Sequence, residues 1–211
     1  MPRTRTVPTA VTPSVLTRPD DEPTAAALIA AAVETMAVHG YHGTSVRDVA
    51  AAAGTSPAVL YHHFESKQRL LVTLLDRGLD VLIAATEEAL DLAGDDPAER
   101  LGAVVGAHVG VHLESQRESL IGQSEIRSLE PAGRALVVTK RDVQQRTFER
   151  VVRDGVRRTV FTTATPDDTA RFVSAACTSV AGWYRPGGPL DGPTVIARYR
   201  AIALDAVGYR P

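Results

Sequence analysis

The sequence predicts an all-α protein with a small N-terminal helical domain, one long connecting helix and a larger helical domain. Apolar residues recur every three or four positions through most of the chain, which is the spacing of an amphipathic helix. No stretch shows the alternation of a half-buried strand. Residues that begin and end helices divide the pattern into an arm (residues 1–23), a head (residues 24–68) and a body (residues 69–211).

Composition limits the class of protein. Cys177 is the only cysteine among 211 residues, so neither an intrachain disulfide nor a cysteine metal cluster is possible. No apolar run approaches the roughly 20 residues of a membrane span, and the N-terminus lacks the apolar segment of a signal peptide. We therefore expect a cytoplasmic protein that has no membrane contact, no cofactor and no metal ion.

The arm is polar, carries five prolines and has no helical periodicity, so we expect it to be disordered. Arg3, Arg5 and Arg18 could reach into a nucleic-acid groove. The acidic residues 20–22 cancel their charge locally, which favours a solvated tail.

The first predicted helix of the head runs from Thr24 to Gly40. Its buried stripe has helical spacing and consists of Leu28, Ile29, Ala32, Val33 and Met36. Gly40 ends the helix, because glycine readily adopts the left-handed conformation found after many helices.

The second half of the head predicts two short helices around a tight turn. Ser45 is suited to cap the first of them, with Asp48 three residues later as in a capping box. Gly54 ends that helix. Ser56 and Pro57 are typical of the cap and the first position of the next helix.

The outer face of this second short helix is suited to a DNA major groove. Leu60 and Phe64 point inward at helical spacing. The outward residues are small, polar or aromatic: Pro57, Ala58, Val59, Tyr61 and His62. A corner of two helices that only pack together is the alternative, but it needs no Tyr-His pair on its outer face. We therefore predict a helix-turn-helix.

This region resembles the DNA-binding domain of the TetR family of one-component repressors. The matching motifs are Gly40-Tyr41, Thr44–Ala50, Ala53-Gly54, Leu60–Phe64 and Ser66-Lys67. Because turn, caps, core and outward residues all agree, the resemblance is specific. It implies a homodimer that binds double-stranded DNA at a palindromic operator through the helix Ser56–His62.

The resemblance also implies the DNA contacts. Ala58 and Val59 would contact base edges, with a thymine methyl as the partner of Val59, where the family usually has Thr. Arg47, Thr55, Tyr61, His62 and Lys67 would mainly position the DNA backbone, and Thr44, Ser56 and Pro57 are further predicted contacts. Residues 24–70 are neutral when their histidines are uncharged, so we expect modest non-specific affinity with a shallow salt dependence.

A long helix follows the head. Ser66 caps it and its apolar positions continue to about Leu92, a length near 40 Å at about 1.5 Å per residue. Such a helix is a strut between head and body. Gly94–Pro97 is the first break after it. Beyond this break we expect helices over residues 98–114, 117–129, 131–153, 166–184 and 192–207.

The last two predicted helices have apolar surface on more than one side. Small residues such as Ala181 and Ala201 alternate with larger ones such as Phe172 and Ile202. The two interpretations are a two-fold four-helix dimer interface, as in the family, and a single monomer core. We favour the dimer, because a helix-turn-helix usually reads two half-sites about 34–36 Å apart.

Several short motifs of the body are similar to repressors of steroid and fatty-acid catabolism in actinobacteria. They are Glu125–Pro131, Arg141-Asp142, Gly155 and Trp183–Gly188. This resemblance implies a small hydrophobic effector, an acyl-CoA thioester. Thr159 departs from the pattern, because relatives tend to have a second glycine there, which puts the geometry of this turn in question.

An acyl-CoA needs an apolar tunnel with cations near its mouth. The predicted ligand contacts are His108, His112, Arg127, Arg141 and Trp183. The two histidines share a helix face, but a metal site would lack a third ligand, so ligand contact or core packing is favoured. Salt bridges are the favoured alternative for the arginines, and Trp183 fits a pocket wall or a dimer interface. Apolar residues of helix 98–114 and of the next helix either line the tunnel or belong to an ordinary core: Leu101, Val104, Val105, Val109, Leu113, Leu120 and Ile121.

No nucleophile elbow, phosphate loop or carboxylate pair stands out, so we predict no enzymatic activity. The resulting hypothesis is a repressor that an effector releases from DNA by favouring a dimer with wrongly spaced heads. The alternatives are an all-α ligand-binding protein and an activator of the same fold.

Overall fold

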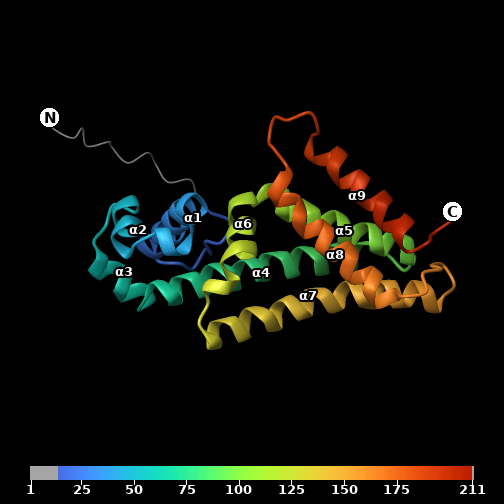
Figure 1. Ribbon diagram of the computed structural model, residues 1–211, viewed down its shortest axis with the longest axis horizontal. Helices are drawn as coiled ribbons and strands as arrows, with labels where there is room; N and C mark the ends of the chain where they lie inside the picture. Colours follow the sequence, from blue (N-terminus) through green and yellow to red (C-terminus); the bar gives the residue numbers. More distant parts are fainter. Residues whose placement is uncertain (1–13, 211) are drawn as a thin grey trace.

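The computed structural model describes residues 14–210, and the ordered elements in this part of the chain are helices (Figure 1). They are α1 (Pro23–Gly43), α2 (Val46–Ala52), α3 (Pro57–Phe64), α4 (Lys67–Leu92), α5 (Pro97–Glu114), α6 (Gln116–Ser124), the 3₁₀ helix η1 (Glu125–Ser128), α7 (Pro131–Arg157), α8 (Pro166–Trp183) and α9 (Gly192–Ala206). The predicted all-α class is confirmed. None of the helices described is both long and apolar enough to cross a membrane.

The head forms as its local signals predict. The regular part of α1 ends at Gly40, whose φ is +69°. The Ser45 hydroxyl accepts the N–H of Asp48 at 3.2 Å, and the Asp48 carboxylate accepts the N–H of Ser45 at 2.8 Å, so the capping box is present. Gly54 ends the turn at φ +68°. Ser56 precedes α3, but its side chain makes no capping hydrogen bond.

The strut is α4, which runs from the head into the body (Figure 1). The Ser66 hydroxyl accepts the N–H of Arg69 at 3.0 Å, as expected of a cap. The helix has 26 residues and ends at Leu92, so it is about 39 Å long at 1.5 Å per residue. In Figure 1, α7 lies along one side of α4, and α6 stands between the head and the rest of the body.

Two helices of the body differ from their predicted ranges. The segment expected as one helix over residues 117–129 is broken into α6 and η1. Helix α7 continues past Gly155 to Arg157. A Cβ on Gly155 would lie 2.0 Å from Cδ2 of Phe161, so this glycine allows close packing and does not end the helix. The left-handed residue after α7 is Thr159, with φ +58°.

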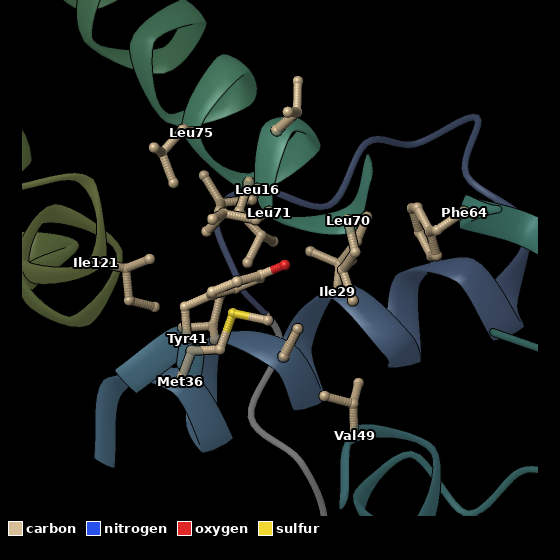
Figure 2. Close-up of a cluster of buried hydrophobic side chains, with 14 of the residues drawn as sticks. Leu16, Ile29, Met36, Tyr41, Val49, Phe64, Leu70, Leu71, Leu75 and Ile121 are labelled. Carbon is tan, nitrogen blue, oxygen red and sulfur yellow. The ribbon is translucent and has the colours of Figure 1, made fainter. Parts of the chain in front are cut away.

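Buried apolar side chains form two cores. The near core joins the head to α4, α6 and the start of α7 (Figure 2): Leu16, Leu28, Ile29, Ala31, Ala32, Val33, Met36, Tyr41, Val49, Leu60, Phe64, Leu70, Leu71, Val72, Leu74, Leu75, Ile121, Leu129 and Val137. The far core joins α5, α7, α8, α9 and the end of α4: Leu90, Ala98, Leu101, Val104, Val105, Val109, Phe148, Val151, Val152, Phe161, Ala170, Val173, Cys177, Val180, Val195, Ala203 and Val207. The apolar stripe of α5 therefore belongs to the far core.

The second part of the expected arm is ordered, which corrects the prediction. Residues 14–22, which we call the strap, pack against α4 and α6. Leu16 is buried in the near core, and the Ser14 hydroxyl donates to the Glu118 carboxylate at 2.7 Å. These contacts with distant residues carry no local sequence signal. Arg3 and Arg5, which were candidates for a nucleic-acid groove, lie outside the described residues.

Candidate nucleic-acid interface and ligand cavity

Helix α3 presents an open face at the end of the head. Leu60 and Phe64 are buried in the near core, as predicted. Ala58, Tyr61 and His62 are exposed, with 52% of Tyr61 accessible. A two-turn helix with a small residue and two aromatic side chains outward has the size and shape that fit a major groove.

The start of α3 is less open than its middle. Pro57 and Val59 are half-buried, and Val59 packs partly against the near core. Thr55 is half-buried, and its N–H donates to the carbonyl of Ala50 at 2.9 Å. Ser56 is exposed and its hydroxyl is not used for capping, so it is available to a phosphate. Val59 therefore offers only part of its side chain to a base edge.

Thr44 and Lys67 do not lie on this open face, which differs from the expectation that they contact DNA. Thr44 is 1% exposed, and its hydroxyl donates to the Gly40 carbonyl at 2.8 Å. The Lys67 ammonium donates to the carbonyls of Tyr41 at 2.9 Å and Thr44 at 2.8 Å, and it lies 4.1 Å from the Tyr41 ring centroid. Both side chains join the end of α1 to the start of α4.

Two exposed cations lie in the head or directly after it, and the first is Arg47 at the start of α2. Arg69 is also exposed and lies 3.9 Å from the Glu65 carboxylate. Glu34 of α1 forms an ion pair with Arg117 of α6 and thus faces the body. Few exposed cations are therefore available to phosphates, as the neutral sequence of the head indicates.

A cavity of about 420 Å³ lies between α4, α5, α6, α7, α8 and the strap. Its apolar walls come mainly from the strap and α4, with contributions from α5 and α7. They include Val15, Leu16, Leu74, Leu75, Leu79, Val81, Leu82, Val111 and Val137. Its polar side chains come mainly from α5, α6, α7 and α8. They include His108, His112, Ser119, Gln123, Arg141, Gln144, Gln145, Arg171, Ser174 and Thr178. Most of the wall is apolar, as in typical small-molecule sites.

His108 lines the cavity with both ring nitrogens engaged. Thr178 donates its hydroxyl to the Ser174 carbonyl at 3.0 Å, so its oxygen accepts the Nε2–H of His108 at 3.0 Å. Nδ1 of His108 then accepts the side-chain amide of Gln144 at 3.3 Å. Burial lowers the pKa of His108 well below its ordinary value, and the charge of a protonated His112 would lower it further. His108 is therefore a neutral imidazole that is held by hydrogen bonds at both ring nitrogens, and it forms part of the cavity wall.

His112 lies next to it, with the two ring centroids 4.7 Å apart. It is 7% exposed, and its Nδ1 lies 3.0 Å from the Ser119 hydroxyl of α6. Its Nε2 has no hydrogen-bond partner among the described residues. Burial, followed by the charge of Arg141, lowers the pKa of His112 to about 4, so the ring is neutral at physiological pH. No group of three or more His, Cys, Asp and Glu in the described residues could hold a metal ion.

Two arginines lie where the cavity meets the surface. Arg141 of α7 and Arg171 of α8 both line the cavity and are both exposed. Arg171 lies 3.8 Å from the exposed carboxylate of Asp168, which is a weak contact. Arg171 was not predicted, because the sequence alone does not fix which helix α8 packs against.

Two of the predicted ligand residues do not line the cavity. Arg127 is exposed on η1, away from the cavity wall. Trp183 is exposed at the end of α8, and its indole stacks on Tyr199 of α9 with the N–H donating to the Tyr199 hydroxyl at 3.3 Å. Of the two alternatives for Trp183, this position is compatible with the interface and not with the pocket wall.

The residues through which α6 lines the cavity differ from the predicted Leu120 and Ile121. Ser115, Ser119, Gly122 and Gln123 line the cavity from one side of this segment, and Ile121 packs into the near core. The spacing of small and polar residues by three or four positions was visible in the sequence. Without the partner helices, this stripe is typical of an ordinary solvent-facing surface.

The outer faces of α8 and α9 remain open in the single chain. Phe172 and Ile202 are 62% and 53% exposed, and small residues of α9 such as Ala197 and Ala201 are also exposed. We call this surface the α8–α9 face. Exposed apolar area of this kind is typical of a surface that another protein covers.

Known families match both parts of the chain. Residues 28–74 match the model of bacterial regulatory proteins of the tetR family. Residues 94–207 match the model of the tetracyclin repressor-like C-terminal domain. Together the two matches include most of the head, the first part of the strut and most of the body, and residues 75–93 lie between them.

Individual proteins give the same result. The HTH-type transcriptional repressor KstR2 of Mycobacterium tuberculosis (strain ATCC 25618 / H37Rv) is 32% identical over 182 residues, which cover 85% of this chain and 90% of the relative. The structure of a tetR-family bacterial regulatory protein from Rhodococcus RHA1 has a TM-score of 0.85 and 29% identity, with coverage of 90% of this chain and 100% of that chain. The structure of KstR2 from Mycobacterium tuberculosis has a TM-score of 0.80 at 28% identity, and the match covers 92% of this chain and 98% of that chain. These matches show that the chain belongs to the TetR family of transcriptional regulators, which bind DNA and are not enzymes.

Proposed function

We propose that the chain is a repressor that binds a palindromic operator as a homodimer and leaves it when a small hydrophobic effector fills the cavity. The observation that carries the proposal is an apolar cavity with two arginines at its surface, in a chain that also presents an open helix-turn-helix. An apolar molecule with an anionic group, such as an acyl-CoA thioester, matches that combination.

On DNA, α3 would lie in the major groove. Ala58 and the accessible part of Val59 would contact base edges, and Arg47, Tyr61 and His62 would position the DNA backbone. Because the head offers few exposed cations, non-specific affinity should be modest and should depend only weakly on salt.

The dimer would form through the α8–α9 face. A second copy covers the exposed side chains of Phe172 and Ile202 and brings a second α3 to the next half-site. Trp183, stacked on Tyr199, lies at the end of this surface and would anchor it.

The relatives support a transcriptional regulator, and the name of one of them refers to fatty acid metabolism. KstR2 is named a transcriptional repressor, and a Bacillus subtilis relative with 30% identity over 47% of this chain is named a fatty acid metabolism regulator protein. AibR, solved in complex with isovaleryl coenzyme A and operator DNA, has a TM-score of 0.79 at 21% identity, which speaks for the shared fold only. In this chain, Arg141 and Arg171 would hold the anionic group.

Helix α6 offers one route from the cavity to the head. Ser119 and Gln123 face the cavity, whereas Ile121 packs into the near core and Arg117 pairs with Glu34 of α1. An effector that shifts α6 would therefore shift the head. It must bind the DNA-incompetent arrangement more tightly than the competent one, since only differential affinity moves the equilibrium.

The proposed DNA face is tested by Tyr61→Ala, with Tyr61→Phe as the control that keeps the ring. We expect the alanine variant to weaken operator binding by about 1–2 kcal/mol, the value of a lost phosphate contact with its packing. Its stability should be unchanged, because the side chain is exposed. Fluorescence anisotropy on DNA from upstream of its own gene measures both affinities. Wild-type affinity in the alanine variant would remove Tyr61 from the contact set.

The proposed effector is tested by mass spectrometry of small molecules that co-purify with the protein, followed by release of operator DNA with the identified compound. We expect an acyl-CoA thioester. The double variant Arg141→Met/Arg171→Met should then need more of the compound for release, with operator affinity unchanged in its absence. The acyl-CoA class would be contradicted if the identified compound is neutral and releases the wild type and the double variant from DNA at the same concentration.

A further inference from the structure

The strap forms part of the cavity wall. Val15 and Leu16 line the cavity beside Leu75 and Gly78 of α4. Leu16 is 2% exposed, and its Cδ2 would lie 3.8 Å from a Cβ placed on Gly78, so it packs directly on α4. Figure 2 shows Leu16 beside Leu71 within the near core. A molecule that fills the cavity therefore touches the strap.

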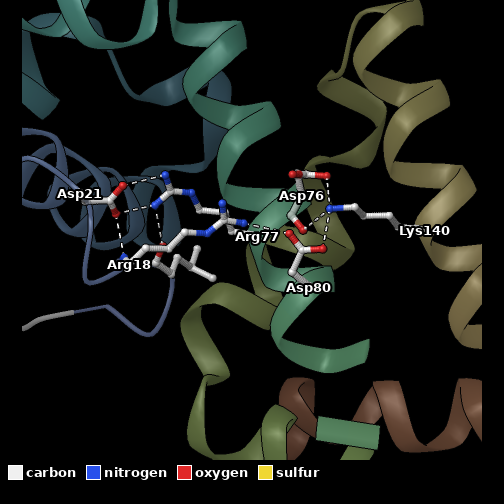
Figure 3. A network of polar contacts seen from close by, with 7 residues as sticks. Arg18, Asp21, Asp76, Arg77, Asp80 and Lys140 are labelled. Atoms are coloured by element: carbon white, nitrogen blue, oxygen red, sulfur yellow. Dashed lines mark hydrogen bonds and ion pairs between the residues drawn. The ribbon is translucent and has the colours of Figure 1, made fainter. Parts of the chain in front are cut away.

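An ion pair in a largely buried position holds the strap on α4 (Figure 3). Nη1 of Arg77 donates to the Leu16 carbonyl at 3.0 Å and to Oδ2 of Asp21 at 2.5 Å, and Nη2 donates to Oδ1 of Asp21 at 2.8 Å. The hydrogen bonds that Arg77 donates to Asp21 lower the pKa of the Asp21 carboxyl, and the same bonds raise the pKa of Arg77. A two-point pair between partly buried groups is strong, and removal of one partner leaves the other charge uncompensated.

Further contacts tie the strap to the other helices around the cavity. Nη2 of Arg18 lies 3.0 Å from Oδ2 of Asp80, and Oδ1 of Asp80 accepts from Lys140 of α7 at 2.6 Å. Asp76 of α4 also pairs with Lys140 (Figure 3). The strap is thus linked to α4 and α7 through one charge network, and to α6 through its N-terminal serine.

The strap joins the head directly, with no flexible linker between them. Turns closed by Thr17 N–H to Ser14 carbonyl and by Asp21 N–H to Arg18 carbonyl, both at 3.1 Å, make it compact. Glu22 is the N-cap of α1 and accepts the first helical hydrogen bond, from Ala26. Displacement of the strap therefore reaches the start of α1, whose buried stripe lies in the near core.

We propose that the strap is an effector-sensing element, in which a molecule in the cavity displaces Val15 and Leu16, opens the Arg77–Asp21 pair and shifts α1 with the rest of the head. The proposal rests on the proposed function, in which the cavity holds the effector and the head binds DNA. It adds a second route beside α6 and predicts that strap contacts favour the DNA-competent arrangement.

The test compares Arg77→Met with Arg153→Met in the full-length protein. Arg153 of α7 is the control, because it also joins two segments through an ion pair, with Asp167 of α8 at 2.6 Å, and it has a second contact with Glu149 of its own helix at 3.3 Å. Amide hydrogen exchange is measured without DNA or effector. We expect Arg77→Met to speed exchange in residues 14–22 and also in residues 23–40. Its operator affinity should fall roughly tenfold, a typical coupling between sites. Arg153→Met should change neither.

The proposal fails if Arg77→Met speeds exchange in the strap while exchange in residues 23–40 stays at the wild-type rate. The strap would then stabilise the fold locally without affecting the head. Leu16→Ala is the second variant, in case Arg77→Met does not fold. It trims the cavity wall and keeps the ion pair, and we expect the same pattern with smaller changes. If wild-type protein binds no operator, the proposed function fails. The exchange measurement still decides the strap proposal, because it uses neither DNA nor effector.

Discussion

The two cores differ in what they connect. The near core takes side chains from the head, the strap and the body, and four of its residues, Leu16, Leu74, Leu75 and Val137, also line the cavity. Within the described residues, the far core takes none from the head, and none of its members lines the cavity. The far core holds the body together, whereas the near core also carries the contact between the cavity and the DNA-binding face.

Because of this difference, we expect substitutions in the near core and in the far core to have different effects, although the residues are chemically similar. A change in the far core should alter the stability of the body and leave the head in place. A change in the near core should alter stability and also the orientation of the head, because close-packed interiors transmit displacements. Mutations matched in chemistry and burial can therefore separate stability from regulation.

The largest expected effect comes from a matched pair, Leu101→Ala in the far core and Leu71→Ala in the near core. Both leucines are fully buried. Each variant should lose about 2–5 kcal/mol of unfolding free energy, from lost transfer energy and the void left behind. Urea denaturation at one fixed protein concentration measures this loss, since the stability of a dimer depends on concentration.

Operator affinity then distinguishes the two cores. Anisotropy under conditions in which each variant is folded should give wild-type affinity for Leu101→Ala and a changed affinity for Leu71→Ala. Equal changes in both variants would mean that the cores do not differ in function.

The second prediction concerns the neutral imidazoles of the cavity wall, His108 and His112. The pKa of His112 is lowered from 6.5 to about 4, so the folded state binds fewer protons than the unfolded state in that interval. The stability contributed by the neutral ring is complete above pH 6.5 and is lost as pH falls towards 4. The loss is on the order of 3 kcal/mol for a shift of this size, and His108, whose pKa is lowered in the same direction, adds to it.

The variant His112→Gln tests this prediction through the slope of stability against pH. Wild type should lose stability faster than the variant between pH 6.5 and pH 4, and the two slopes should agree between pH 7 and pH 8. Parallel curves over the whole range would show that His112 is accessible to protons in the folded protein. Urea denaturation at each pH supplies the values.

The elements of the head could be predicted because their signals are local. The capping box of Ser45 and Asp48, the turn at Gly54 and the cap at Ser66 each depend on residues within four positions. The strut from Ser66 to Leu92 follows from one continuous periodicity. Leu60 and Phe64 point inward for the same reason.

The residues of the sites were harder to predict, because their roles depend on distant partners. Thr44 and Lys67 have types that suit phosphate contact, but the fold uses them between α1 and α4. Prediction of the cavity residues would have required knowing that α7 packs against α8. This packing places Arg141 and Arg171 where the cavity meets the surface, whereas Arg127 lies outside the cavity. The strap is polar in composition. The sequence therefore contains no indication that Leu16 is buried or that Asp21 forms an ion pair with Arg77 of α4.

The smallest expected effect lies next to the far core, at the turn after α7. Thr159 occupies the left-handed region at φ +58°, and the N–H groups of Val160 and Phe161 both donate to the Gly155 carbonyl, at 2.9 and 3.1 Å. This is the position where a helix commonly ends with glycine. The turn therefore keeps its geometry with a residue that is strained there by about 1–2 kcal/mol.

Replacement of Thr159 by glycine should raise the unfolding free energy by about 1 kcal/mol, because relief of the strain exceeds the entropy lost by glycine on folding. Thr159→Ala is the control, since it removes the β-branch but keeps a Cβ in the left-handed conformation. Thermal and urea denaturation should show a gain for glycine only, and operator affinity should stay at the wild-type value in both variants because the turn adjoins the far core and not the head. An equal gain with alanine would trace the cost to the branched side chain, and an altered operator affinity would show that the far core also communicates with the head.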